Sequence, residues 1–330
     1  MKMFNKIINK KIITILLVVL AVLGMTACSK KTDKKAEGGP VKIRFANLTI
    51  GLTSAYDNIG IKKGIFEKYG IDLQVINFRG GAEAAAGIAS KQVDMGSFGT
   101  PILISISKGF PIKLVAAPAD KWINFVLVGA NHINSIADLK GKTVATGGIG
   151  GGNHQSFVTI IEKSGLKETD VRVMATGGVD AFMIIKSGQV DAIQTSEPTV
   201  SQIVADGAGH VLAEAKDYYG DYQHSFIFAT DDFIENHPDA IRNFLKASRE
   251  SLEYCRDHFE ELVAEGKTLV GLDEPIIRKF YENDIKKWDL TFQIDLKGTA
   301  NAVEIVKNLG EIDKNISFDE KTWVNFDFLE

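Results

Sequence analysis

The sequence predicts an α/β protein made of two lobes of related construction. Strand-like apolar runs alternate along the chain with helical stretches, which is typical of sheets covered by helices. A block of sequence also recurs, because nine of the 22 positions from 80 to 101 are identical in 177–198, at an offset of 97. Two copies do not form a solenoid, but they form two lobes that enclose a cleft. The length of 330 residues fits two domains.

The first copy supplies the elements of the first lobe. Val41, Ile43 and Phe45 alternate with polar residues, which predicts a strand. Gly70 ends the helix that precedes the second strand, and Pro101 opens a helix where proline loses no hydrogen bond. The predicted elements are strands at 41–48, 71–78 and 93–98, and helices at 55–69, at 82–90 and from Pro101.

The second copy and the C-terminal third follow the same pattern. We expect strands at 142–146, 171–175 and 191–195, and helices at 153–164 and after Gly177-Gly178. A short apolar run at 226–229 then precedes helices at 238–258, 274–288 and 297–309, which return to cover the first lobe. Strands that alternate with helices predict parallel sheets with helices on both faces.

Composition excludes several classes of protein. Apolar residues make up 45% of the chain and charged residues 24%, as in ordinary globular proteins. The net charge of -4 provides no basic surface for nucleic acid. Two cysteines, Cys28 and Cys255, cannot form a disulfide framework, and the sequence has no metal-ligand spacing and no Gly-x-Ser-x-Gly elbow. We therefore expect neither a metal nor another cofactor and no catalytic group.

The N-terminus is predicted to be a targeting segment. Four lysines precede an uncharged apolar run at 12–23, which is short for a membrane span and typical of an export signal. Small residues then lead to Cys28, and a polar stretch follows. This resembles a bacterial lipoprotein signal, in which residues 1–27 are removed and the cysteine carries the lipid. Residues 28–40 are then a flexible tether.

Five loops follow predicted strands and face the edge where ligands bind in parallel sheets. They are 49–54, 79–81, 99–100, 147–156 and, as the fifth, 176–178 with 195–197 next to it. The most informative is 147–156, because five glycines in the six residues 147–152 precede a predicted helix. Free backbone N–H groups and the helix dipole suit a sulfonate, carboxylate, phosphate or nitrate there. The candidate ligand-binding residues of the five loops and their surroundings are Thr53, Ser54, Arg79, Gly80, Gly81, Gly99, Thr100, Trp122, Gly151, Gly152, Asn153, His154, Thr176 and Glu197.

Several of these residues admit two interpretations. Arg79 either pairs with an anion or is a solvated loop residue, and His154 either contacts the ligand or is a polar residue at a helix start. Trp122 either forms a wall of the pocket or belongs to the core. Glu197 does not suit an anion, so it either receives an amine or hydroxyl or holds the lobes together.

Blocks at 64–71, 90–94, 139–144 and 188–198 resemble the nitrate/sulfonate/taurine-type substrate-binding proteins of ABC importers, over about residues 41–330. The resemblance implies a type II periplasmic-binding-protein fold, in which two doubly wound lobes joined by two hinge strands capture a ligand by closure. Lobe one would comprise 41–117 plus 229–330, and lobe two 118–228. Related families bind pyrimidine precursors of thiamine or form pyrimidines with a cysteine-rich motif, which this sequence lacks.

The expected function is capture of a small anion, such as a sulfonate, taurine or nitrate, at the outer face of the cytoplasmic membrane. We expect a lipid-anchored monomer that delivers its ligand to an ABC permease and its ATPase. The alternatives are a binding protein for a neutral or cationic heterocycle, such as a pyrimidine vitamin precursor, an enzyme that acts on such a heterocycle, and a sensory ligand-binding subunit.

Overall fold

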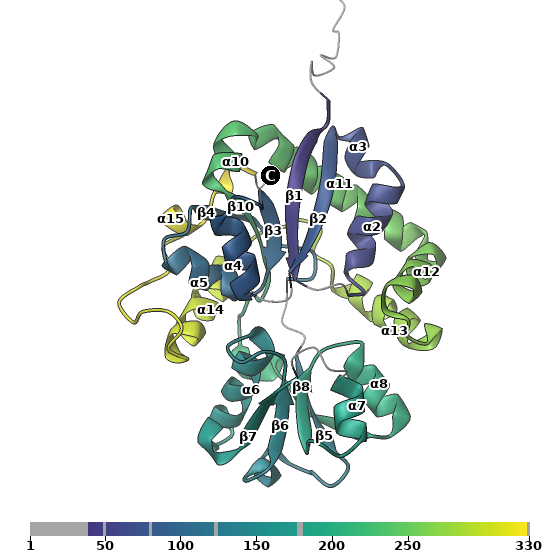
Figure 1. Ribbon diagram of the computed structural model, residues 1–330, viewed down its shortest axis with the longest axis vertical. Coiled ribbons are helices and arrows are strands. Elements are labelled where there is room, and N and C mark those ends of the chain that lie inside the picture. Colours follow the sequence, from purple (N-terminus) through teal and green to yellow (C-terminus); the bar gives the residue numbers. More distant parts are fainter. Residues whose placement is uncertain (1–38, 49–50, 79–80, 122–124, 177–180, 329–330) are drawn as a thin grey trace, which may run out of the picture. The chain divides into compact units, whose positions relative to one another are not determined.

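The strands pair into two sheets of five strands each (Figure 1). The computed structural model describes residues 39–48, 51–78, 81–121, 125–176 and 181–328, of which all but residue 39 belong to one compact unit, Pro40–Glu330. The lipid-attachment prediction at Cys28 lies outside the described residues. No helix among the described residues has both the length and the apolar character needed to cross a membrane.

The first sheet has the order β2-β1-β3-β10-β4. Its strands are β1 (Val41–Leu48), β2 (Ile71–Phe78), β3 (Met95–Phe98), β4 (Ile112–Ala116) and β10 (Phe226–Thr230). β1 runs parallel to β2 and β3, whereas β10 runs antiparallel to both β3 and β4.

The second sheet has the equivalent order, β7-β6-β8-β5-β9. Its strands are β5 (Val126–Ala130), β6 (Thr143–Thr146), β7 (Arg172–Ala175), β8 (Ala192–Thr195) and β9 (Gly209–Glu214). The prediction of parallel sheets holds for β1–β3 and for β6–β8, but it was wrong for β5 and β10, which each run antiparallel to both of their neighbours. These two strands are the first that the chain forms after it crosses from one sheet to the other, and the sequence analysis did not predict β4, β5 or β9.

Helices cover both faces of each sheet (Figure 1). Alternation along the strands divides the core: Phe45 belongs to a cluster with Phe244, whereas the next residue, Ala46, belongs to a cluster on the opposite face. In the second sheet, the consecutive residues Val144 and Ala145 likewise belong to hydrophobic clusters on opposite faces. The cluster that contains Ala46 and Val144 is continuous, so it provides one hydrophobic core shared by the two sheets.

The helices agree with the sequence in part. They are α2 (Ser54–Lys62), α3 (Ile65–Lys68), α4 (Gly81–Ala89), α5 (Pro101–Ser107), α6 (Gly152–Lys163), α7 (Ala181–Lys186), α8 (Thr199–Asp206), α9 (Lys216–Tyr219), α10 (Asp231–Asn236), α11 (Pro238–Asp257), α12 (Phe259–Val270), α13 (Glu274–Asp284), α14 (Leu296–Asn308) and α15 (Glu320–Trp323). Short 3₁₀ turns occur at Ile136–Leu139, Glu168–Asp170, Ile285–Lys287 and Phe326–Phe328.

Two of the helix predictions need correction. The single helix predicted at 55–69 is two helices, because Gly64 takes a φ of +69°, a left-handed conformation that interrupts the helix. Helix α12, which begins after the chain bends at His258 at the end of α11, was not predicted from the sequence. The predicted helices at 238–258, 274–288 and 297–309 correspond to α11, α13 and α14.

The internal repeat has a visible structural basis in Asp94 and Asp191. The Asp94 carboxylate accepts the backbone N–H of Arg44 over 2.8 Å, and the Asp191 carboxylate accepts that of Thr143 over 2.8 Å. Each aspartate therefore ties the loop before β3 or β8 to the neighbouring parallel strand. Both carboxylates therefore have a structural role.

Candidate functional site

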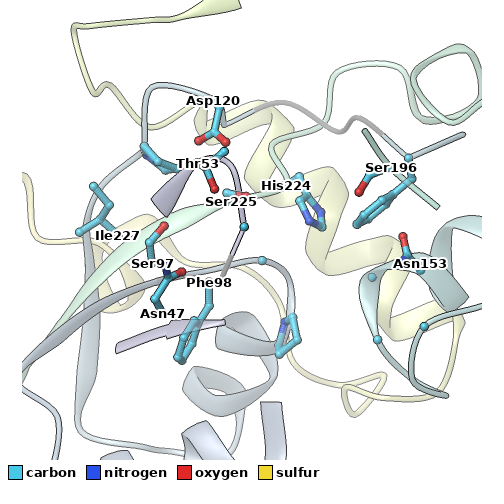
Figure 2. A pocket seen from close by; sticks show the side chains of 18 of the residues that line it. Asn47, Thr53, Ser97, Phe98, Asp120, Asn153, Ser196, His224, Ser225 and Ile227 are labelled. Atoms are coloured by element: carbon cyan, nitrogen blue, oxygen red, sulfur yellow. The ribbon is translucent and has the colours of Figure 1, made fainter. Parts of the chain in front are cut away.

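A cavity of about 1310 Å³ lies at the carboxyl ends of the parallel strands of both sheets. The first sheet contributes the loop after β1, the end of β3 and the segment 118–120 after β4, and the second contributes the loops after β6 and β8. Figure 2 shows Thr53 and Asp120 on one side of the view, Asn153 and Ser196 on the other, and His224 between them. This is the edge at which the sequence predicted ligand binding.

Six of the predicted residues line this cavity: Thr53, Gly99, Gly151, Gly152, Asn153 and Glu197. Arg79, Gly80 and Trp122 lie outside the described residues, as do Gly177 and Gly178 of the fifth loop. Of Gly81, only its place at the start of α4 is described. The structure thus brings residues of three predicted loops, Thr53, Gly99 and 151–153, together around one space with Glu197 from the segment beside the fifth loop.

Four predicted residues do not line the cavity, and the hydrogen bonds described for each of them lie within the fold. Ser54 accepts the N–H of Gly51 over 3.2 Å, and the buried Thr100 donates its hydroxyl hydrogen to Gln155 Oε1 over 2.8 Å. The Thr176 amide donates to the carbonyl of Thr146 over 2.9 Å. The fourth residue is His154, whose contacts fix the glycine loop.

Both ring nitrogens of His154 are engaged. Nδ1 accepts the N–H of Gly150 over 3.1 Å, and Nε2 lies 2.9 Å from Glu168 Oε1. Gly150 itself takes a φ of +77°, which requires glycine for the sharp turn into α6. His154 therefore positions the loop, and its side chain is not among those that face the cavity.

The N-terminus of α6 faces the cavity through Gly152 and Asn153. No acceptor among the described residues takes the N–H groups of these two residues, and the buried Oδ1 of Asn153 also lacks a partner within the described part of the chain. A β-carbon at Gly152 would lie 3.0 Å from both His224 and Phe125, so the glycine allows these two rings to pack closely against the start of α6. Free amide donors at a 12-residue helix suit an anionic group.

His224, which the sequence analysis did not select, occupies the middle of the cavity wall. Its ring packs edge-on against Phe125, with the ring centroids 4.8 Å apart. Burial lowers the pKa of His224 to about 4, so the imidazole is neutral at neutral pH. Its buried Nδ1 has no hydrogen-bond partner among the described residues.

Charge on the described cavity wall is mostly negative. The acidic lining residues are Asp57, Glu83, Asp120, Glu197 and Glu311, and the single basic residue among the described lining residues is Lys108. Glu197 is partly committed to the fold, because its carboxylate accepts the backbone N–H and the hydroxyl of Ser201, both over 3.0 Å. The described aromatic lining residues are Phe45, Tyr56, Phe98, Phe110, Phe125, Phe244, Phe280, Trp288 and Phe292.

Sequence reasoning missed Asp57, Asp120, His224 and Trp288 for an identifiable reason. Asp57 lies within a helix, and His224 and Trp288 lie far along the chain from the repeated loops. Asp120 follows the buried end of β4, a strand that was not predicted. Within the described part of the chain, no group of three or more His, Cys, Asp or Glu residues is placed to hold a metal ion.

Two mixed sheets of equivalent strand order, with a cavity at the carboxyl ends of their parallel strands, define the fold of periplasmic solute-binding proteins. The chain belongs to the NMT1/THI5-like family, whose sequence pattern matches residues 56–262.

Individual relatives agree with this assignment. A Bacillus subtilis (strain 168) protein named "Putative aliphatic sulfonates-binding protein" is 23% identical over 333 residues, which span 98% of this chain and 96% of the relative. The crystal structure of the periplasmic aliphatic sulphonate binding protein SsuA from Escherichia coli has a TM-score of 0.73 at 21% identity, covering 88% of this chain and 94% of that one. The 4-amino-5-hydroxymethyl-2-methylpyrimidine phosphate synthase THI5 of Saccharomyces cerevisiae (strain ATCC 204508 / S288c) is 25% identical over 207 residues, which span 58% of this chain and 60% of the synthase.

Proposed function

We propose that this chain is the extracytoplasmic solute-binding protein of an ABC importer and captures a small organic anion. Sulfonates rank first among the candidate ligands. The observation that carries the proposal is the pair of amides at Gly152 and Asn153, which face a cavity lined from both sheets. A helix N-terminus stabilises an anion through its free N–H donors and its dipole. The names of the Bacillus subtilis and Escherichia coli relatives support the same ligand class.

Capture would proceed by closure of two lobes, 41–117 plus 229–330 and 118–228. In support, β1 to β4 of the first sheet come from the first set of residues, and β10 (Phe226–Thr230) spans the boundary between the two sets. The chain crosses between the sheets twice, after β4 and before β10. The cavity is lined from both sheets, so a ligand that touches both favours the closed arrangement over the open one. A binding protein of this kind needs no catalytic group and passes its ligand to a permease.

The proposed location rests on the N-terminal sequence. Removal of residues 1–27 and acylation of Cys28 would hold the protein at the outer face of the cytoplasmic membrane. A Cys28→Ser variant expressed in a bacterium that processes lipoproteins is expected to leave the membrane fraction. Retention of this variant in the membrane to the same extent as the wild type would contradict the anchor.

Thermal denaturation of the full chain tests the ligand class. Sulfonates, taurine, nitrate, carboxylates and pyrimidines are each added over a concentration series. A bound ligand at 100 times its dissociation constant adds about 2.7 kcal/mol to the unfolding free energy. Stabilisation by at least one sulfonate is the expected result, whereas stabilisation by pyrimidines alone overturns the anion proposal.

A further inference from the structure

The cavity carries a feature that a simple anion does not explain. Five acidic side chains and one lysine line its described wall, so an anion alone would meet a field of its own sign. We propose that the part of the cavity lined by Asp57 and Asp120 binds a cationic group, a protonated amine or amidine, of the ligand. Together with the anionic group of the proposed function, on which this inference rests, the ligand is then a small molecule of both charges.

The two carboxylates come from different elements and face the same space. Asp57 lies on α2, and Asp120 follows β4. Among the described residues, neither carboxylate forms an ion pair with a lysine, arginine or histidine. Lys121, next to Asp120, points its ammonium elsewhere, to Asp289 Oδ2 over 2.6 Å and to the carbonyl of Gln293 over 2.8 Å.

Burial makes these charges costly when the cavity holds no ligand. Desolvation raises the pKa of Asp57 to about 6 and is the largest cause that raises the pKa of Asp120 to about 7, to which Asp284 and Asp57 add repulsion. A cation that enters the cavity offsets both effects, because it supplies the missing opposite charge. Acidic side chains that are half-buried at a cavity and lack a paired cation are therefore consistent with a cation that arrives with the ligand.

Asp284, the acidic neighbour of Asp120, already has hydrogen-bond donors within the protein. Its Oδ2 accepts the hydroxyl of Tyr56 over 2.5 Å and the indole N–H of Trp288 over 3.0 Å. Asp284 therefore orients Tyr56 and Trp288, both of which line the cavity. The electron-rich faces of such aromatic rings attract organic cations, and their area also covers a carbon skeleton.

The part of the cavity lined by Asp57 and Asp120, called the cationic chamber below, suits an organic cation better than a metal ion. Within the described part of the chain, the acids are not grouped as a set of three that could ligate a metal. The rings of Phe45, Phe244, Phe280 and Phe292 complete the lining, and a metal ion with its water shell gains little from such a wall.

Isothermal titration calorimetry with the full chain tests the inference through matched pairs. The probes are taurine against ethanesulfonate, and 3-aminopropanesulfonate against propanesulfonate, with propylamine as the cation alone. In at least one pair, the amino compound is expected to bind tenfold or more tightly than its partner. In Asp57→Asn and Asp120→Asn variants this preference is expected to disappear, while the affinity for the plain sulfonate stays equal or rises.

Asp217→Asn is the matched control, because Asp217 is exposed on α9 and is not among the residues that line the cavity. Thermal melting establishes that each variant is folded. Equal binding within both pairs, or a preference unchanged in both aspartate variants, overturns the cationic chamber and leaves the sulfonate proposal standing. Binding of propylamine that Asp120→Asn abolishes, with no gain from a sulfonate, supports the chamber and overturns the anion proposal.

Discussion

The hydroxyl of Thr100 donates a hydrogen bond to Oε1 of Gln155 over 2.8 Å, which joins the start of α5 to α6. The same Gln155 side chain donates from Nε2 to the carbonyl of Gly150 over 2.9 Å. Helix α5 follows a strand of the first sheet and α6 follows a strand of the second, so one buried amide links both sheets to the glycine loop.

Thr100→Val tests this link. Valine has the shape of threonine but no donor, so Gln155 Oε1 is left buried without a partner. We expect the free energy of unfolding to fall by about 1 to 3 kcal/mol, measured by urea denaturation. Thr100→Ser keeps the hydroxyl and serves as the control; a valine variant as stable as the serine variant would show that the bond contributes nothing.

Asp120 predicts a pH dependence of stability in the absence of ligand. An unfolded aspartate has a pKa near 3.9, whereas burial and acidic neighbours raise that of Asp120 to about 7. The folded state therefore binds more protons between these values, and the contribution of Asp120 falls as the pH rises through this window. Asparagine does not titrate, so Asp120→Asn removes this loss of stability. The free energy of unfolding of the variant is expected to exceed that of the wild type by about 1 to 3 kcal/mol at pH 8 and to differ little at pH 4.

Other groups titrate in the same range, so the difference between variant and wild type is the quantity to measure. Burial raises the pKa of Asp57 to about 6, which acts in the same direction as Asp120. His224 acts in the opposite direction, because its pKa is lowered to about 4 and its contribution is lost as the pH falls below about 6.5. A flat difference curve from pH 4 to pH 8 would contradict the account of Asp120.

Asn153→Asp tests the anion end of the cavity. The new carboxylate would lie at the helix N-terminus, where it favours the helix, but it would repel a bound sulfonate. We expect at least a tenfold loss of sulfonate affinity by calorimetry, with no loss of thermal stability. Asn134→Asp, an exposed position away from the cavity, controls for net charge. Unchanged affinity in Asn153→Asp would remove Asn153 from the site.

Cys255 is expected to be inert in the folded protein. Its side chain is fully buried on α11, and burial raises the pKa of the thiol to about 12. In a Cys28→Ser background, a thiol reagent should modify no cysteine in buffer and one in denaturant. Rapid modification in buffer would show that α11 opens or packs differently.

The sequence was informative where a pattern repeats or punctuates the chain. The offset of 97 between copies corresponds to the equivalent positions of β3 and β8, and Asp94 and Asp191 hold equivalent hydrogen bonds. Proline and glycine located the starts of α5 and α6. These are local signals, and they placed Thr53, Gly99 and Asn153 around one space.

Tertiary packing decided what the sequence could not predict. The antiparallel direction of β10 depends on where the chain returns, which no local pattern of 226–230 contains. The site at Asp57, Asp120 and Trp288 arises because α2, the end of β4 and the segment after α13 meet. Conversely, His154 had the right position for a ligand residue, but Glu168 and the Gly150 amide engage its ring.

A crystal structure of the full chain with its tightest-binding sulfonate tests the central claim most directly. The account predicts the sulfonate oxygens within hydrogen-bonding distance of the Gly152 and Asn153 amides, and any amine of the ligand beside Asp57 or Asp120. A ligand bound outside this cavity, or one whose sulfonate lies against the two aspartates, would contradict it.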